Sequence, residues 1–195
     1  MNMKIAAAVL LAGALVLVGC ASPAPSDHSS MPSMDHGSSS APASDANEAD
    51  VMFASMMIGH HQQAIEMSDL VLGKDDVDER VVDLAERIKD AQAPEIEQMQ
   101  GWLDDWGVDA ADAGGMEHGD GMMSEDDMAA LEKAPGGEAS RLFLEQMIVH
   151  HEGAMEMAAA QIADGENADA VALAEDIVSA QSDEIAEMRE ILASL

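Results

Sequence analysis

The feature that most constrains the fold is a duplicated segment in which two adjacent histidines stand among methionines. MMIGHHQQAIEM at 56–67 is matched, 90 positions later, by MIVHHEGAMEM at 147–157. The recurring residues are Phe53, Met57, Ile58, His60, His61, Ala64, Glu66 and Met67, which return as Phe143, Met147, Ile148, His150, His151, Ala154, Glu156 and Met157. Apolar residues recur at spacings of three and four in both copies, so each copy is predicted to form a helix with one buried face.

A second pair of matching segments lies further along each half of the chain. Ala85, Glu86, Ile88, Ala91, Gln92, Glu95, Ile96 and Met99 return, 89 positions on, as Ala174, Glu175, Ile177, Ala180, Gln181, Glu184, Ile185 and Met188. Each half therefore contains two helical segments and is predicted to form a helical hairpin. Two such hairpins make a four-helix bundle.

The apolar period, with glycines near three of the four ends, delimits the expected helices. They span about 47–72, 77–106, 138–163 and 168–195. A short helix is also expected from Ser124, which Asp127 can cap from three residues on. The predicted fold is an all-α four-helix bundle at 47–195, made of repeats at about 47–106 and 138–195, and the stretch 107–137 is long enough to cross it.

The first 19 residues have the form of an export signal. Lys4 supplies positive charge, and the apolar run that follows is too short and wrongly flanked for a stable membrane span. The run ends in Leu-Val-Gly-Cys at Cys20, which resembles the lipobox of bacterial lipoproteins. We therefore predict a signal peptide at 1–19, a lipidated Cys20, a flexible tether at 20–46 and an extracytoplasmic domain anchored to a bacterial membrane. An ordinary signal peptide with a chance cysteine is the alternative.

Composition limits the partners. The chain has 39 acidic and 8 basic residues, for a formal charge of -31, so its surface repels nucleic acid and concentrates cations. Cys20 is the only cysteine, which leaves neither an intrachain disulfide nor a thiolate metal site. Seventeen methionines stand against two Phe, two Trp and no Tyr. Methionine therefore either does the packing that aromatic residues usually do or has another role.

The duplicated segment carries soft ligands. His60 lies three residues after Met57 on the same helix face, and the second copy repeats this arrangement. An imidazole and a thioether together, without carboxylates, suit Cu(I) or Ag(I) better than Mg, Ca or Mn. A thioether also persists in an oxidising compartment where a thiol would be lost. The predicted metal ligands are Met57, His60, His61, Met67, Met147, His150, His151, Met155 and Met157.

Two alternatives compete with a copper site. Carboxylate di-iron bundles place Glu three residues before His, but none of the seven histidines here has Glu at that position. In both copies the position is occupied by methionine, which disfavours iron. The other alternative is a purely structural core, because a methionine stripe at helical spacing usually packs and an inward histidine is usually hydrogen-bonded.

Further residues could assist a metal site. Two flexible strings combine methionine with histidine and could form a secondary site, unless they are polar linkers with incidental methionines: Met31, Met34 and His36, and then Met116, His118, Met122 and Met123. Four polar residues near the inner faces of the second and fourth helices could accept the ring N–H that a ligating histidine leaves free. They are Gln92, Glu95, Gln181 and Glu184, for which helix-interface hydrogen bonding or solvent exposure is the alternative.

The paired motifs resemble domain-of-unknown-function family 305, DUF305. The resemblance covers about residues 47–195 and rests on F-x3-MI-x-HH-x2-A-x-EM, at Phe53–Met67 and Phe143–Met157, and on AQ-x2-EI-x2-M, at Ala91–Met99 and Ala180–Met188. It implies a ferritin-like four-helix bundle that is often secreted or lipid-anchored, and some members are CopM-like periplasmic proteins that bind copper and silver. Many members have Pro before the histidine pair, where this chain has Gly59 and Val149.

These observations together predict an extracytoplasmic protein that binds a soft metal. We expect it to bind copper, with Cu(I) favoured and Ag(I) or Cu(II) as alternatives, and to sequester the ion or deliver it. The expected partners are metal ions and, through the lipid anchor, a membrane. Two other classes stay open: a metal-free helical interaction module at the membrane surface, and a ferritin-like metal oxidase. The sequence shows no nucleophile–base arrangement and no phosphate loop, and apart from the metal-oxidase alternative no enzymatic activity is predicted.

Overall fold

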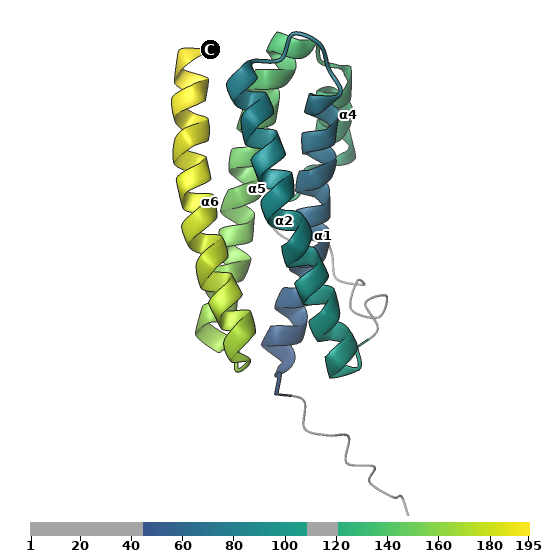
Figure 1. Ribbon diagram of the computed structural model, residues 1–195, viewed down its shortest axis with the longest axis vertical. Helices are drawn as coiled ribbons and strands as arrows, with labels where there is room; N and C mark the ends of the chain where they lie inside the picture. Colours follow the sequence, from purple (N-terminus) through teal and green to yellow (C-terminus); the bar gives the residue numbers. More distant parts are fainter. Residues whose placement is uncertain (1–44, 109–120) are drawn as a thin grey trace, which may run out of the picture. The chain divides into compact units, whose positions relative to one another are not determined.

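The computed structural model describes residues 45–108 and 121–195, which fold into five helices (Figure 1). In chain order these are α1 (Glu48–Leu72), α2 (Glu79–Trp106), α4 (Glu125–Lys133), α5 (Gly136–Asp164) and α6 (Ala168–Ser194). The helices pack as two hairpins, since α1 lies against α2 and α5 lies against α6. The hairpins meet mainly through α1 and α5, and α4 contacts both of these helices. The fold is therefore all-α, as the sequence predicts.

The helix ends follow from capping chemistry. Asn47 caps α1, because its side chain accepts from Asp50 N while the Asp50 carboxylate accepts from Asn47 N. Ser124 and Asp127 form the same reciprocal pair at the start of α4, as expected. Gly107 ends α2 with a left-handed backbone. The observed bounds agree with the expected ones to within two residues.

Helix α2 continues through Pro94. A proline inside a helix removes one backbone hydrogen bond, and the carbonyl that loses its partner is that of the residue four positions earlier, Asp90. Both residues lie on the exposed side of α2, where water can bond this carbonyl. The helix therefore tolerates a proline that its counterpart in α6, with Asp183 at the equivalent position, does not contain.

Helices α1 and α5 run antiparallel. Near one end of the pair, Gln161 Nε2 of α5 donates to Asp50 Oδ1 of α1 at 2.5 Å. Nearer the middle of both helices, the ring of His60 lies against the ring of His150. Equivalent residues of the duplicated segment therefore face each other where the two helices pass.

The core consists of two apolar clusters. The Phe143 cluster contains, among others, Ala64, Met67, Val71, Leu84, Ile88, Leu131, Phe143, Leu144, Met147 and Met188. The Phe53 cluster contains, among others, Phe53, Ala54, Met57, Ile58, Ile96, Met99, Leu103, Ala154, Leu173 and Ile177. Along each of the four long helices, the buried residues pass from one cluster to the other across buried polar side chains. This polar layer consists of His60 and His61 on α1, Gln92 on α2, His150 and His151 on α5, and Gln181 on α6.

Gly136, the first residue of α5, is packed under the turn between α1 and α2. A Cβ at this position would overlap the backbone of Asp75 and Asp76, whereas a Cβ on its neighbour Gly137 would meet open space. Backbone atoms cannot move aside as a flexible side chain can. We therefore expect Gly136→Ala to lower the free energy of unfolding by about 2 kcal/mol or more.

Denaturant unfolding followed by circular dichroism would measure this effect. Gly137→Ala is the matched control, because it makes the same chemical change one residue further along the same helix. It should leave the stability unchanged or raise it by up to about 1 kcal/mol, since Ala is the better helix former. Equal stability of the two variants would contradict the close packing of Gly136.

None of the helices in the described ranges is long and apolar enough to span a membrane. The predicted signal peptide, Cys20 and the predicted tether up to residue 44 lie outside the described residues.

Candidate metal centre

The centre of the polar layer is a pair of histidines, one from each hairpin. His60 of α1 and His150 of α5 have ring centroids 3.7 Å apart and ring planes inclined by 40°. Both side chains are buried. The two imidazoles therefore lie in direct contact within the buried polar layer.

The neighbouring histidines are each held by a glutamate from the other helix of the same hairpin. His61 Nε2 lies 2.7 Å from Glu95 Oε2 of α2, and His151 Nε2 lies 2.6 Å from Glu184 Oε2 of α6. Both histidines are fully buried, while the glutamates are partly exposed. Among the described residues, Nδ1 of His61 and Nδ1 of His151 have no hydrogen-bond partner. A carboxylate on one ring nitrogen leaves the other nitrogen available as a metal ligand.

The electrostatics of the layer favour a neutral imidazole at His150. Burial lowers the pKa of His150 well below its ordinary value, and the proximity of His60, His151 and His61 lowers it further. His150 therefore stays uncharged at neutral pH. The neutral ring is the form that binds a metal ion.

Methionines flank the histidine pair on both sides. Met57 precedes His60 by three residues, and Met147 precedes His150 by three residues. In each copy the Cα atoms of the methionine and the histidine are therefore about 4.5 Å apart along the helix axis. Met57 belongs to the Phe53 cluster and Met147 to the Phe143 cluster, and both are fully buried. Each apolar cluster therefore contributes one methionine beside the polar layer.

The other predicted methionine ligands lie further away. Met67 follows His60 by seven residues, and Met157 follows His150 by seven residues. Each separation is about 10 Å along the helix axis. Met67 is fully buried in the Phe143 cluster, and Met157 packs against the Phe53 cluster while half-exposed. Met155 lies one turn beyond His151 and is also half-buried. Of the predicted methionine ligands, Met57 and Met147 are thus the nearest to the central histidines along their helices.

The described part of the chain contains no group of three or more His, Cys, Asp or Glu side chains placed to hold a metal ion. The four residues predicted to orient the histidines divide into two kinds. Glu95 and Glu184 contact the outer histidines, as given above. Gln92 and Gln181 are buried in the polar layer, and their Oε1 atoms have no hydrogen-bond partner within the described ranges.

The predicted secondary site is described only in part. Met122 and Met123 are half-buried beside α1, where Gln63 Nε2 donates to Met123 O at 2.9 Å and Met123 N donates to Gln63 Oε1 at 2.7 Å. Together with Met128 they line a pocket of about 800 Å³. The other members of the two Met/His strings lie outside the described residues: Met31, Met34, His36, Met116 and His118.

Two methionines of α1 escaped the sequence analysis. Met52 and Met56 line a groove between α1 and α5 together with Met157. Their four-residue spacing places them on one face of the helix, and this spacing could have been noticed. Neither residue recurs in the second copy, so the duplication does not mark them.

Fold and site together define an all-α protein in which two helical hairpins meet at buried histidines. The chain belongs to the DUF305 family, a domain of unknown function whose model matches residues 50–192. A Streptomyces coelicolor member described as secreted is 34% identical with a TM-score of 0.70, over 78% of this chain and 95% of that one. A DUF305 fragment from Deinococcus radiodurans is 31% identical with a TM-score of 0.69, over 77% and 99% of the two chains.

The chain is also similar to CopM, a protein whose structure has been solved with metals bound. The Cu(I)-bound form of CopM is 32% identical with a TM-score of 0.61, over 74% of this chain and 96% of that one. CopM has also been solved in Cu(II)-bound and silver-bound forms, with TM-scores of 0.63 and 0.61. None of the curated protein sequences compared with this chain matches it.

Proposed function

We propose that this protein binds copper outside the cytoplasm, with Cu(I) favoured and Ag(I) or Cu(II) as alternatives, and that it sequesters or delivers the ion. The observation that carries the proposal is the buried contact between His60 and His150, whose ring centroids lie 3.7 Å apart. The similarity to CopM, which has been solved with copper and with silver bound, supports the same choice of metal.

The chemistry of the surrounding donors favours a soft ion. Neutral imidazoles and the thioethers next to them are ligands that Cu(I) and Ag(I) prefer over hard cations. A cation would also bring positive charge into the layer, where Glu95 and Glu184 lie on the outer histidines and can balance it. The proposed ligands are therefore His60, His150 and one or both of Met57 and Met147.

The unsatisfied ring nitrogens of the outer histidines support a ligand role for these residues too. A buried polar atom without a hydrogen bond costs about 1–3 kcal/mol. In the described part of the chain, Nδ1 of His61 and Nδ1 of His151 are two such atoms. Coordination of a metal ion would satisfy each of them, and the glutamate on the opposite nitrogen would hold each ring in place.

We further propose that the domain is a ferritin-like four-helix bundle built from two repeated helical hairpins, with a long crossover at 107–137. The duplicated sequence and the contact of equivalent histidines support this architecture. We also propose that the protein binds metal without catalysing a reaction. Its ferritin-like alternative, a metal oxidase, would consume Fe(II) or Cu(I) with turnover in the presence of oxygen.

The proposed location is the outer side of a bacterial membrane, with the domain tethered by a lipid on Cys20. The Leu-Val-Gly-Cys ending of the apolar run supports the anchor, and the Streptomyces coelicolor relative that is described as secreted supports the compartment. Mass spectrometry of the protein purified from membranes would test the anchor. A chain that keeps residues 1–19, or that carries an unmodified Cys20, would exclude it.

An anaerobic Cu(I) titration against a chromophoric chelator tests the function, with Zn(II) and Fe(II) titrated alongside. We expect the protein to remove Cu(I) from the chelator and to show no comparable affinity for Zn(II) or Fe(II). A protein that never competes with the chelator would have a structural polar layer only, and an interaction module would then be the better description. Oxidation of Fe(II) with many turnovers would instead identify an oxidase.

The glutamates of the polar layer give a separate prediction. Glu95→Gln combined with Glu184→Gln should weaken Cu(I) binding by about 10- to 100-fold, because the amides no longer fix the rings of His61 and His151 as strongly. The chelator titration measures this loss. Glu86→Gln with Glu175→Gln is the matched control, since these glutamates are exposed and occupy equivalent positions on α2 and α6. An equal loss in both variants would mean that surface charge, and not ring orientation, controls the affinity.

A further inference from the structure

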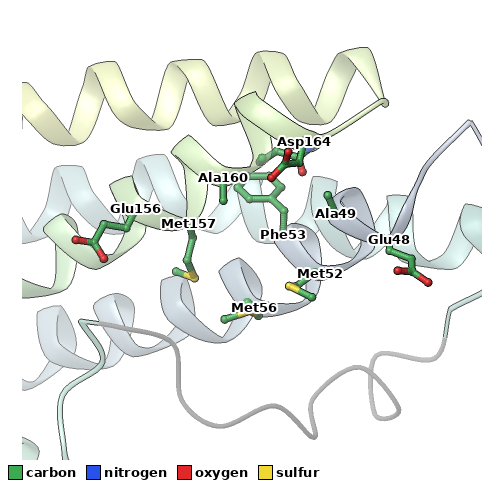
Figure 2. A pocket seen from close by; sticks show the side chains of 10 residues that line it. Glu48, Ala49, Met52, Phe53, Met56, Glu156, Met157, Ala160 and Asp164 are labelled. Atoms are coloured by element: carbon green, nitrogen blue, oxygen red, sulfur yellow. The ribbon is translucent and has the colours of Figure 1, made fainter.

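The groove between α1 and α5 is lined by three methionines. Met52 and Met56 come from α1 and Met157 comes from α5, with Phe53 beside them (Figure 2). The groove has a volume of about 470 Å³ and lies in the half of the protein that contains the Phe53 cluster. It is separate from the buried histidine pair, because its lining includes no histidine among the described residues.

These thioethers are accessible from solvent. Met52 is 45% exposed, and Met56 and Met157 are half-buried. By contrast, five methionines of the two core clusters are fully buried: Met57, Met67, Met99, Met147 and Met188. Core packing therefore accounts for those five but not for the position of Met52.

The second copy of the duplicated segment shows that the fold does not require methionines at positions 52 and 56. The positions equivalent to Met52 and Met56 are occupied by Leu142 and Gln146. In that half α4 lies against both α1 and α5, and Gln146 Nε2 donates to Asp127 O of α4 at 3.0 Å. In the second copy, Leu142 and Gln146 therefore occupy these positions without a methionine. Helix pairing alone does not explain the thioethers of Met52 and Met56.

The charges around the groove favour a cation. Glu48, Glu156 and Asp164 line it, and no Lys or Arg stands among the described lining residues (Figure 2). Carboxylates at the edge raise the local concentration of positive ions, while neutral thioethers select the soft ones among them. An apolar peptide would gain nothing from this acidic edge.

We propose that Met52, Met56 and Met157 form a second, solvent-accessible site for Cu(I) or Ag(I), at which an ion binds before it reaches the histidine pair. This inference rests on the proposed function and adds an entry point to it. Met56 lies one turn before His60 and directly precedes the buried Met57. The two sites are therefore about 6 Å apart along the axis of α1.

Methionine methyl spectra of the full chain, labelled with ¹³C at the Met ε-methyl groups, test the proposal with Ag(I) as the probe. We expect the signals of Met52, Met56 and Met157 to shift together as Ag(I) is added. We also expect these shifts to persist in the His60→Ala, His150→Ala variant, because the groove contains no histidine. Addition of Zn(II) should leave the three signals in place.

The variant Met52→Leu, Met56→Leu, Met157→Leu should bind one Ag(I) fewer per chain and should keep its fold, since Leu replaces Met at nearly equal volume. Met99→Leu with Met188→Leu is the control, because these buried methionines occupy equivalent positions and lie outside the groove. It should bind as much Ag(I) as the unaltered protein.

The outcomes separate this inference from the proposed function. If Ag(I) shifts the histidine ring signals but leaves the three groove methyl signals unchanged, the entry site is excluded and the buried site stands. If neither set of signals responds at saturating Ag(I), both proposals fail. A groove that responds while the histidines do not would support the surface site and overturn the buried one.

Discussion

Replacing His60 and His150 together with alanine is expected to weaken Cu(I) binding at least about tenfold, because both central imidazoles are lost. The rings face each other across the boundary between the hairpins, so each single variant should leave one imidazole and the flanking thioethers. Single variants should therefore lose less affinity than the double variant. The anaerobic chelator titration measures all three. An unchanged affinity in the double variant would exclude the histidine pair as the metal site.

Loss of binding must be distinguished from loss of fold. His60→Leu combined with His150→Leu removes the same nitrogens while keeping side-chain volume in the core. Replacing buried polar groups by apolar groups of similar shape can be nearly neutral or stabilising. We therefore expect this apoprotein to unfold at a denaturant concentration no lower than the unaltered apoprotein does. Its Cu(I) affinity should nevertheless fall as far as that of the alanine variant.

Metal-dependent stability gives an independent readout of the same site. A ligand that binds only the folded state at a free concentration one hundred times its Kd stabilises that state by about 2.7 kcal/mol. Unfolding of the unaltered protein should shift accordingly when Cu(I) is present. The double histidine variants should lose the part of this shift that the buried site contributes. A full shift in those variants would place the bound copper elsewhere in the chain.

The helices were predictable from sequence because local signals agreed with the tertiary structure. The inward positions of the long helices keep their three- and four-residue spacing through the polar layer, and Asn47 and Ser124 begin their helices with reciprocal caps. The third long helix begins two residues earlier than expected, at Gly136. There Pro135 occupies the cap position, and a glycine is required beneath the turn between α1 and α2. A close approach of this kind depends on distant backbone and leaves no periodic signal.

The sequence predicts that the histidines point into the bundle, but it does not predict their position along the bundle axis. The stripe that contains Met57, His60 and Met67 marks one helix face along its whole length. A metal site occupies only a few ångströms of that length, and the register between α1 and α5 decides which part. Because the two copies meet at His60 and His150, Met67 lies about two turns away and packs in the Phe143 cluster instead.

The hydrogen bonds between Asp50 and the second hairpin were also beyond sequence reasoning. As the third residue of α1, Asp50 reads as part of a capping box with Asn47. The structure adds bonds to residues more than one hundred positions away, at the end of α5 and the start of α6. Gln161 Nε2, Glu166 N and Asn167 N all donate to its carboxylate. A local motif therefore gave no indication of a contact between hairpins.

Replacing Asp50 with alanine is expected to lower the free energy of unfolding by about 3–5 kcal/mol. The carboxylate is fully buried, and its removal would leave donors of Gln161, Glu166 and Asn167 without their acceptor. It would also remove the half of the capping box in which Asn47 N donates to this carboxylate. Denaturant unfolding at neutral pH measures the loss. Asp90→Ala on α2 is the control, since Asp90 is exposed, and it should change the stability by less than about 0.5 kcal/mol.

The stabilisation by Asp50 should also disappear in acid. Burial by itself raises the pKa of this carboxyl, but the hydrogen bonds from Asn47, Gln161, Glu166 and Asn167 outweigh burial and lower the pKa. The unfolded chain then binds this proton more readily, so the contribution is complete above the unfolded value of about 3.9 and is lost as the pH falls through the lower folded value. The stability difference between the unaltered protein and Asp50→Asn, measured from pH 7 to pH 2, should therefore shrink below about pH 4. A difference that stays constant to pH 2 would mean that the charge of Asp50 does not hold the two hairpins together.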